Sequence, residues 1–99
     1  MREMTNINDV AMLLAKVQHG IDKRIAIEII SDHSLTYTMF RYDSKVVLVI
    51  EVNDDNTIDL SCGWQKIKFE DFTTFNNRFF NVDWFRLFAC DLIKVEGYE

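Results

Sequence analysis

The chain has 99 residues with a hydrophobic content of 48%, which is enough apolar material for the core of one domain, residues 1–99, and leaves no room for a second core. Its net charge is −5, with five acids and five bases in residues 1–42 and eleven acids and six bases in residues 43–99. This negative potential disfavours direct binding to DNA or RNA, and the longest apolar run, Val46 to Ile50, is far too short to span a membrane.

The start of the chain has the pattern of an amphipathic helix. Asn6 is placed to cap its N-terminus, and Gly20 is placed to end it. Apolar residues recur between them at helical spacing, at Ile7, Val10, Ala11, Leu14 and Val17. An amphipathic stretch at this position is not a secretory signal, so we expect a cytoplasmic protein.

The middle of the chain has the pattern of consecutive β-strands joined by short turns. A nearly continuous aliphatic run, Lys45–Val52, predicts a strand that is central in a sheet or covered on both faces. Other strands are expected at 24–29, Leu35–Tyr42 and Thr57–Cys62, with a fifth at Gln65–Phe69. Because the connections are short, we expect neighbouring strands to pair in an antiparallel meander.

The last third of the chain returns to helical spacing. Phe72, Phe75 and Phe79 fall on one face of a helix. The polar residues of the segment 83–94 also share one arc of a helical wheel, which predicts a second helix there after a break near 81–83. The predicted fold is therefore α+β, with an N-terminal helix, a four- or five-stranded antiparallel meander and two C-terminal helices packed on one face of the sheet.

We find no motif for catalysis, a cofactor or a metal. Either His19 or His33 could act as a base for the Cys62 nucleophile, but only if the fold brings the two side chains together. Cys62 and Cys90 have neither metal-binding nor redox spacing. The segment 53–59 resembles a calcium loop in its oxygen content, but it lacks the loop glycine and the closing glutamate. We expect no cofactor and no metal site, and we expect the cysteines to lie in the core.

Two features remain as candidates for function. The first is an acidic surface formed by the hairpin residues Asp43, Glu51, Asp54, Asp55 and Asp59 and by Glu70 and Asp71 at a helix start. The second is aromatic density, since seven aromatic residues lie among the seventeen residues 72–88. Two short helices cannot bury all of them against one sheet, so we expect exposed anchors for a protein interface or a homodimer among Phe80, Trp84 and Phe85.

These features favour a small, acidic, non-enzymatic protein-interaction domain whose partner is a protein with a basic surface. One concrete form is an inhibitor from a phage or mobile element, of the anti-CRISPR or anti-restriction type, that occludes a basic nucleic-acid-binding groove of its target. The alternative is a small-ligand-binding domain or an enzyme with a pocket between sheet and helices, lined by Tyr37, Tyr42, Trp64 and His33.

Overall fold

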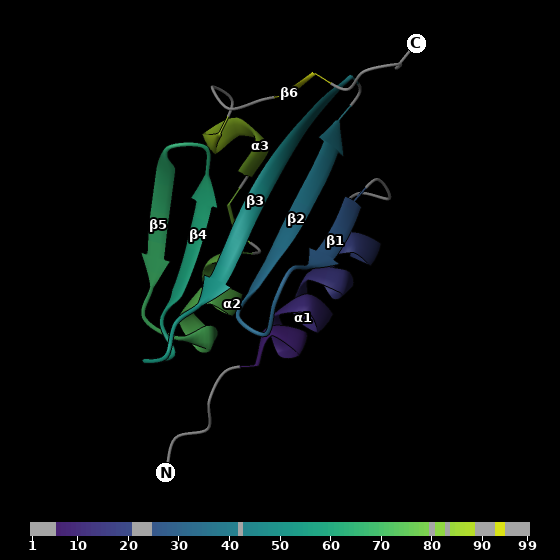
Figure 1. Ribbon diagram of the computed structural model, residues 1–99. Helices are drawn as coiled ribbons and strands as arrows, with labels where there is room; N and C mark the ends of the chain where they lie inside the picture. Colours follow the sequence, from purple (N-terminus) through teal and green to yellow (C-terminus); the bar gives the residue numbers. More distant parts are fainter. Residues whose placement is uncertain are drawn as a thin grey trace.

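The computed structural model describes residues 6–20, 25–41, 43–79, 81–82, 84–88 and 93–94 (Figure 1). A helix precedes five consecutive strands, and two further helices and a short strand follow them. In chain order the elements are α1 Ile7–Gly20, β1 Ile25–Ile29, β2 Ser34–Arg41, β3 Ser44–Val52, β4 Ile58–Cys62, β5 Gln65–Phe69, α2 Phe72–Phe79, α3 Trp84–Leu87 and β6 Ile93–Lys94.

The strands β1 to β5 lie side by side in chain order, and each pairs antiparallel with the next. This arrangement confirms the α+β class and the antiparallel meander. β3 is the middle strand, as its aliphatic run predicts. The short strand β6 also pairs with β3, at Ser44 and Lys45, beyond the residues of β3 that pair with β4.

Of the two alternatives that the aliphatic run predicts for β3, the central position is confirmed and cover on both faces is not observed. Its side chains alternate, so that Val46, Leu48 and Ile50 are fully buried, whereas Val49 is 40% exposed and Glu51 is exposed. Aliphatic residues suit the pleated backbone of a strand even where only one face is covered. The run therefore reports strand propensity and the central position, and it does not report burial of both faces.

Helix α1 follows its predicted boundaries. The Asn6 side-chain Oδ1 accepts a hydrogen bond from the Asn8 backbone N–H at 2.8 Å, which is the geometry of a helix N-cap. Ile7, Val10 and Leu14 form the buried face. In the part of the chain that the structure describes, no helix is both long and apolar enough to cross a membrane.

The core joins alternate residues of the strands to residues of all three helices. From Phe69 onward, the buried core members that the structure describes are all aromatic: Phe69, Phe75, Phe79, Trp84 and Phe88. Consecutive rings touch from Phe69 through Phe75, Phe79 and Trp84 to Phe88, with centroids 5.2 to 5.7 Å apart. Such contacts add stabilisation beyond the burial of area alone. Five of the aromatic residues of 72–88, namely Phe72, Phe75, Phe79, Trp84 and Phe88, therefore serve packing.

The prediction that Trp84 is an exposed anchor is wrong. Only 5% of this residue is exposed, and its indole Nε1 donates a hydrogen bond to the Phe79 carbonyl at 3.1 Å. Trp84 packs between the rings of Phe79 and Phe88, so the short helix α3 buries an aromatic residue on the core side. Phe80 lies outside the described residues, and for Phe85 only the backbone is described.

The prediction of one helix over 83–94 is wrong at its end. Helix α3 covers only Trp84–Leu87, and Ile93–Lys94 is a strand. β4 pairs with β3 only between Val49 and Val52. The backbone of Ser44 and Lys45, at the other end of β3, therefore pairs with β6. A helical wheel reports local periodicity and contains nothing about a distant strand edge.

Candidate interaction surface at the acidic end of the sheet

The fold gathers acidic residues from separate parts of the sequence at one end of the sheet. Register places the turns 30–33 and 53–57 and the residues after β5 at this end, because Ser34 pairs with Glu51 and Ile58 pairs with both Val52 and Phe69. The start of α1 lies there too, since it shares a pocket with Asp32 and Asn53. We call this region the acidic end and define it by Asp9, Asp32, Asp54, Asp55, Glu70 and Asp71.

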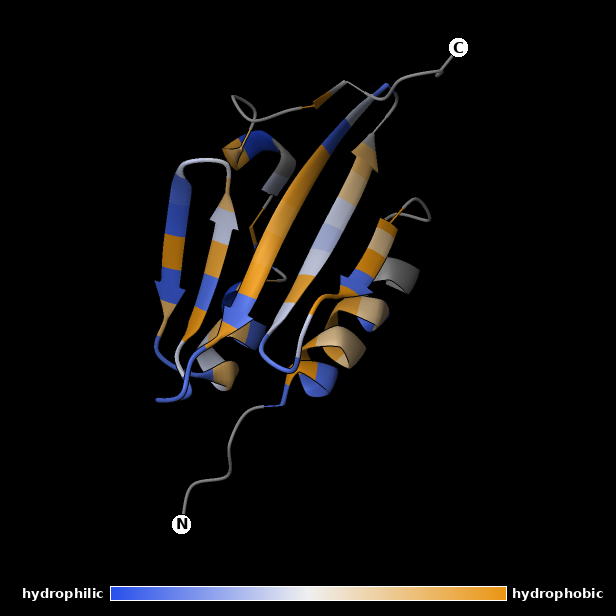
Figure 2. Cartoon of the chain, viewed as in Figure 1, coloured by the Kyte–Doolittle hydropathy of each residue, from blue (hydrophilic) through white to orange (hydrophobic). Residues whose placement is uncertain are grey.

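The acidic end is strongly hydrophilic. In Figure 2 blue residues gather at the lower end of the sheet, where the chain turns between β1 and β2, between β3 and β4, and after β5. The turn residues 30–33, 53–57 and 70–71 contain no lysine or arginine. Asp9, Asp32, Asp54, Asp55 and Glu70 are all exposed. Their charges therefore act together on solvent and on any approaching molecule.

The turn between β3 and β4 is held by its own side chains. Asn53 Nδ2 donates to Thr57 Oγ1 at 2.9 Å, and the Thr57 hydroxyl in turn donates to Asp55 Oδ1 at 2.6 Å. The backbone N–H of Thr57 donates to the same carboxylate oxygen at 3.1 Å. Asn56 adopts a left-handed φ of 68°, a conformation that asparagine tolerates better than most residues. The turn thus presents Asp54 from a fixed backbone.

Asp55 therefore both stabilises the turn by its hydrogen bonds and contributes to the negative charge of the acidic end. The hydrogen bonds from the Thr57 hydroxyl and backbone lower the pKa of Asp55 below its usual value of 3.8, and the positive charge of Lys68 lowers it further. Hydrogen bonding to the ionised carboxylate is the largest cause of the lowered Asp55 pKa. Because the residue is exposed, the opposing effect of burial is smaller. Asp55 is therefore a fixed negative charge at neutral pH.

The prediction that Asp59 presents its charge to a partner is wrong. Asp59 is only 5% exposed, on the sheet row between Glu51 and Lys68. Its Oδ2 accepts a hydrogen bond from Asn53 Nδ2 at 3.1 Å and lies 3.4 Å from Lys66 Nζ. Its side chain points along a strand face rather than from the turn, so neighbouring side chains cover it. Asp59 is a structural carboxylate.

The junction between β5 and α2 contributes one capping acid and one exposed acid. Asp71 Oδ1 accepts a hydrogen bond from the Thr74 backbone N–H at 2.8 Å, and the Asp71 carbonyl accepts one from the Phe75 N–H at 3.1 Å. Asp71 is therefore the N-cap of α2. Glu70, one residue earlier, is exposed. Only Glu70 of this pair extends its carboxylate into solvent.

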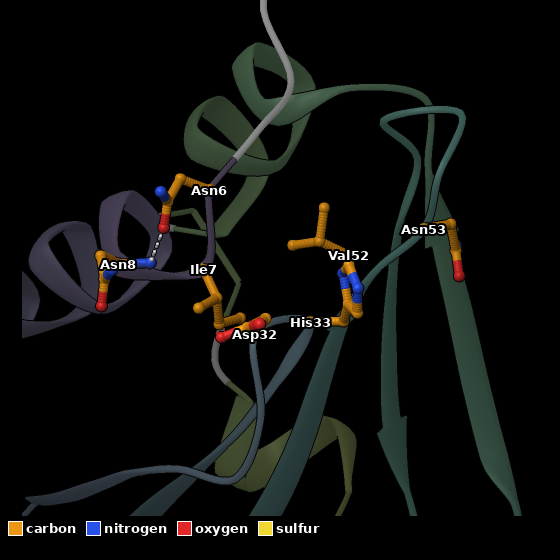
Figure 3. Close-up of a pocket in the computed structure, with 7 residues that line it drawn as sticks. All are labelled: Asn6, Ile7, Asn8, Asp32, His33, Val52 and Asn53. Carbon is orange, nitrogen blue, oxygen red and sulfur yellow. Dashed lines mark hydrogen bonds between the residues drawn. The ribbon is translucent and has the colours of Figure 1, made fainter.

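A pocket of about 250 Å³ opens at the acidic end, between the start of α1, the β1–β2 turn and the end of β3 (Figure 3). It is lined by Asn6, Ile7, Asn8, Asp32, His33, Val52 and Asn53. In the close-up the Asn53 side chain points away from the other six residues, consistent with its bonds within the turn. Most of the polar lining residues are exposed, so the pocket is an indentation in the acidic end.

The structure does not assemble the predicted pocket between sheet and helices. Tyr37 is 1% exposed and packs edge to face on Phe79, and Tyr42 lies outside the described residues. His33 is at the acidic end, where its carbonyl accepts the Val52 N–H. Trp64 follows β4 at the opposite end of the sheet.

The pairing of His33 with Cys62 is also not realised. Cys62 comes one residue after Ser61, which pairs with Val49, so Cys62 lies level with Leu48. His33 lies level with Val52, four residues away along β3, which corresponds to about 13 Å of strand. Cys62 is buried in the core, as its sequence context predicts. Cys90 and the side chain of His19 lie outside what the structure describes, so their predictions stay untested. Within the described residues, no group of three or more His, Cys, Asp or Glu side chains is placed to hold a metal ion.

Trp64, which the sequence analysis assigns to a pocket, is instead an exposed aromatic residue that was not predicted as an interface anchor. It is 84% exposed in the two-residue turn between β4 and β5, next to Gly63, which has a left-handed φ of 60°. The available signal is the pair Gly63-Trp64 between two predicted strands, because a side chain in so short a turn has no core to enter. Trp64 lies at the far end of the sheet from the acidic end, so the two candidate features are separate surfaces.

Comparison of the chain with protein-family models, with curated proteins and with solved structures finds no match.

Proposed function

We propose that this chain is a non-enzymatic protein-interaction domain that binds a basic surface of a protein partner with its acidic end. One observation carries the proposal: turns distant in sequence deliver exposed carboxylates to the same end of one sheet, with no lysine or arginine among the turn residues. Clustered charge of one sign speeds association with an oppositely charged surface and selects against partners of the same sign.

Preorganisation supports the proposal. The side chains of Asn53 and Thr57 brace the β3–β4 turn, and Asp71 caps α2, so the backbone that carries Asp54 and Glu70 is already fixed. A surface that needs no ordering when it binds loses less conformational entropy. The structural carboxylates hold the turns, and the exposed ones remain for contact.

We further infer that α1, α2 and α3 all pack on one face of the sheet. The buried strand residues alternate along β3 and join one cluster with residues of all three helices, and Figure 1 is consistent with the helices lying together behind the sheet. This arrangement commits one face to the core. The ends and the opposite face then remain for partners.

A basic groove that normally holds nucleic acid is the kind of partner that fits best. Its lysines and arginines would meet carboxylates in place of phosphates, and occupation of the groove would exclude the nucleic acid by charge and by volume. An inhibitor of the anti-CRISPR or anti-restriction type would work in this way. The same negative charge argues against direct binding of the chain to DNA or RNA.

The test is charge reversal at matched positions. D54K reverses an exposed charge at the acidic end, and D43K makes the same change in net charge at an exposed residue at the other end of the sheet. We expect a partner captured by the wild-type chain to be captured equally by D43K and to be lost with D54K and with E70K. With the purified partner, affinity for the wild type should fall as salt rises.

Competition then separates inhibition from simple binding. We expect the wild-type chain and D43K, but not D54K, to displace a fluorescent oligonucleotide from the partner. Equal affinity of D54K and the wild type at low salt would contradict the use of the acidic end. If the oligonucleotide leaves the partner because it binds to this chain, that result would contradict occlusion of the partner's groove.

A further inference from the structure

The pocket at the acidic end is small, with a volume of about 250 Å³. Sites that hold a cofactor or a drug-sized ligand are usually larger, at about 300 to 1,000 Å³. The pocket is also open to solvent, because most of its polar lining residues are exposed. Its size and position therefore suit a single side chain that a partner inserts from outside.

The pocket has an apolar base and a polar rim. Ile7 and Val52 are each only 3% exposed, so they form the base, where the alkyl part of a long side chain finds apolar contacts. Figure 3 shows the start of α1 on one side of the space, Val52 and His33 on the other side, and Asp32 between them. The exposed residues of the rim are Asn6, Asn8, Asp32 and His33.

Three polar side chains of the rim are available to a ligand. Within the described residues, the Asn8 amide, the Asp32 carboxylate and the His33 ring make no hydrogen bond and no ion pair. The other two polar residues of the pocket are engaged, because Asn6 Oδ1 caps α1 and the Asn53 amide bonds within its own turn. A carboxylate, an amide and an imidazole ring therefore remain for binding.

The charges around the pocket favour a cation. The start of a helix usually favours an anion, but here the Asn8 N–H donates to Asn6 Oδ1 at 2.8 Å and the Asp9 N–H donates to the Asn6 carbonyl at 2.9 Å. These donors are thus used within the helix. Asp32 places a carboxylate in the rim, and the exposed Asp9 and Asp54 add to the negative potential of the acidic end.

We propose that this pocket receives an arginine side chain of the basic partner, with its guanidinium group on the Asp32 carboxylate. This role rests on the function proposed above, since it names one residue type on the surface that the acidic end binds. A guanidinium group is planar, presents paired N–H donors to a carboxylate and stacks on flat rings such as that of His33. The ammonium group of lysine pairs with a carboxylate only as a point charge, so the rim favours arginine.

Titration with a capped amino acid tests the pocket without the partner. Nα-acetyl-L-arginine N-methylamide carries the guanidinium group as its only charge, and the matching citrulline compound has a neutral group of nearly the same shape. At about 0.15 M salt, we expect the arginine compound to shift the backbone amide NMR signals of Asn8, His33 and Val52 saturably. The citrulline compound should leave these signals nearly unchanged, and the matching lysine compound should bind more weakly than the arginine compound.

Two variants separate this pocket from general attraction to the acidic end. D32N removes the carboxylate of the rim and should raise the Kd of the arginine compound about three- to fivefold, as expected for an exposed ion pair. D54N makes the same change in net charge outside the pocket, and should leave that Kd nearly unchanged because salt screens distant charges. Asp32 and Asp54 are both exposed, so both variants should keep the fold, which circular dichroism verifies.

Equal binding of the arginine and citrulline compounds overturns the proposal, and so does equal weakening of the arginine compound by D32N and D54N. Equal affinity for the lysine and arginine compounds overturns the choice of arginine. With the purified partner, D32N should weaken binding by a factor similar to that for the arginine compound. Unchanged affinity of D32N for the partner would show that the pocket holds no arginine of that partner.

Failure of the pocket and failure of the proposed function are separate results. Loss of the partner with D54K, combined with no binding of the arginine compound, would keep the acidic end as the interaction surface and reject the pocket. Binding of the arginine compound, combined with full retention of the partner by D54K and E70K, would keep the guanidinium site and contradict the proposed function.

Discussion

At the scale of single residues, carboxylates that look alike in the sequence have different roles in the fold. Asp71 caps a helix, Asp59 is buried beside Asn53 and Lys66, and Asp55 accepts two hydrogen bonds from Thr57. Asp54 and Glu70 are exposed. The difference lies in the donors within reach of each carboxylate, which turn and helix geometry supply.

The ionisation of Asp55 provides a test at this scale. The folded-state pKa of Asp55 lies below 3.8, so its ionised form stabilises the folded chain above that pH, and this contribution is lost as the pH falls through the lowered pKa. T57V removes the hydroxyl donor and should raise the Asp55 pKa towards 3.8, as followed by carboxyl carbon shifts in an NMR titration. T73V, at an exposed threonine of α2, should leave the Asp55 titration unchanged. An unaltered Asp55 pKa in T57V would show that the hydroxyl is not the main cause.

At the scale of elements, each helix and strand is positioned by what its ends can bind. Helix α1 begins at the Asn6 cap, and α2 begins at the Asp71 cap directly after β5. Strand β6 exists because β3 extends beyond the residues that pair with β4. Helix caps are encoded in the local sequence, whereas an unpaired segment of β3 with which β6 can pair exists only once the sheet has formed.

Adjacent acids at the start of α2 allow the capping role to be measured against a matched control. D71A removes the acceptor for the Thr74 N–H and should lower the free energy of unfolding by about 1 kcal/mol, measured by urea denaturation. D71N keeps an N-cap acceptor and should retain most of that stability. E70A, at the exposed neighbour, should change the free energy of unfolding by less than about 0.5 kcal/mol. Equal losses in D71A and E70A would contradict the assignment of the cap.

At the scale of the whole molecule, the sheet separates two surfaces. Its acidic end collects the turns at 30–33 and 53–57 and the start of α2, and its other end carries Trp64. Among the described aromatic side chains of 72–88, Phe72, Phe75, Phe79, Trp84 and Phe88 pack in the core. The two tryptophans therefore belong to opposite environments, one in the core and one in solvent.

This contrast gives a paired prediction for the two tryptophans. W84A removes a ring packed between Phe79 and Phe88 and should lower the free energy of unfolding by about 3 to 5 kcal/mol. W64A removes a side chain that is 84% exposed and should change it by less than about 0.5 kcal/mol. Chemical denaturation measures both values, and acrylamide should quench the fluorescence of Trp64 more strongly than that of Trp84. Comparable destabilisation by the two substitutions would contradict this assignment of core and surface.

Local sequence signals were enough to predict the fold class and every element before residue 80. Periodicities of two and of 3.6 residues are local, and so are the signals of Asn6, Gly20 and the aliphatic run of β3. These signals place α1, the five strands of the meander and α2 close to their observed bounds. Short connections between strands were enough to predict antiparallel neighbours, because so few residues cannot form a crossover.

Which residues share a surface depends on how the elements pack, and the sequence pattern does not predict it. Asp54 and Glu70 are sixteen positions apart but meet at one end of the sheet through the pairing of β4 with β5, while the neighbours Glu70 and Asp71 differ in exposure and role. Burial of Trp84 and Asp59 likewise depends on side chains that lie outside their own helix or strand. The physical reason is that periodicity orients a side chain relative to its own element, whereas exposure depends on what the other elements place against it.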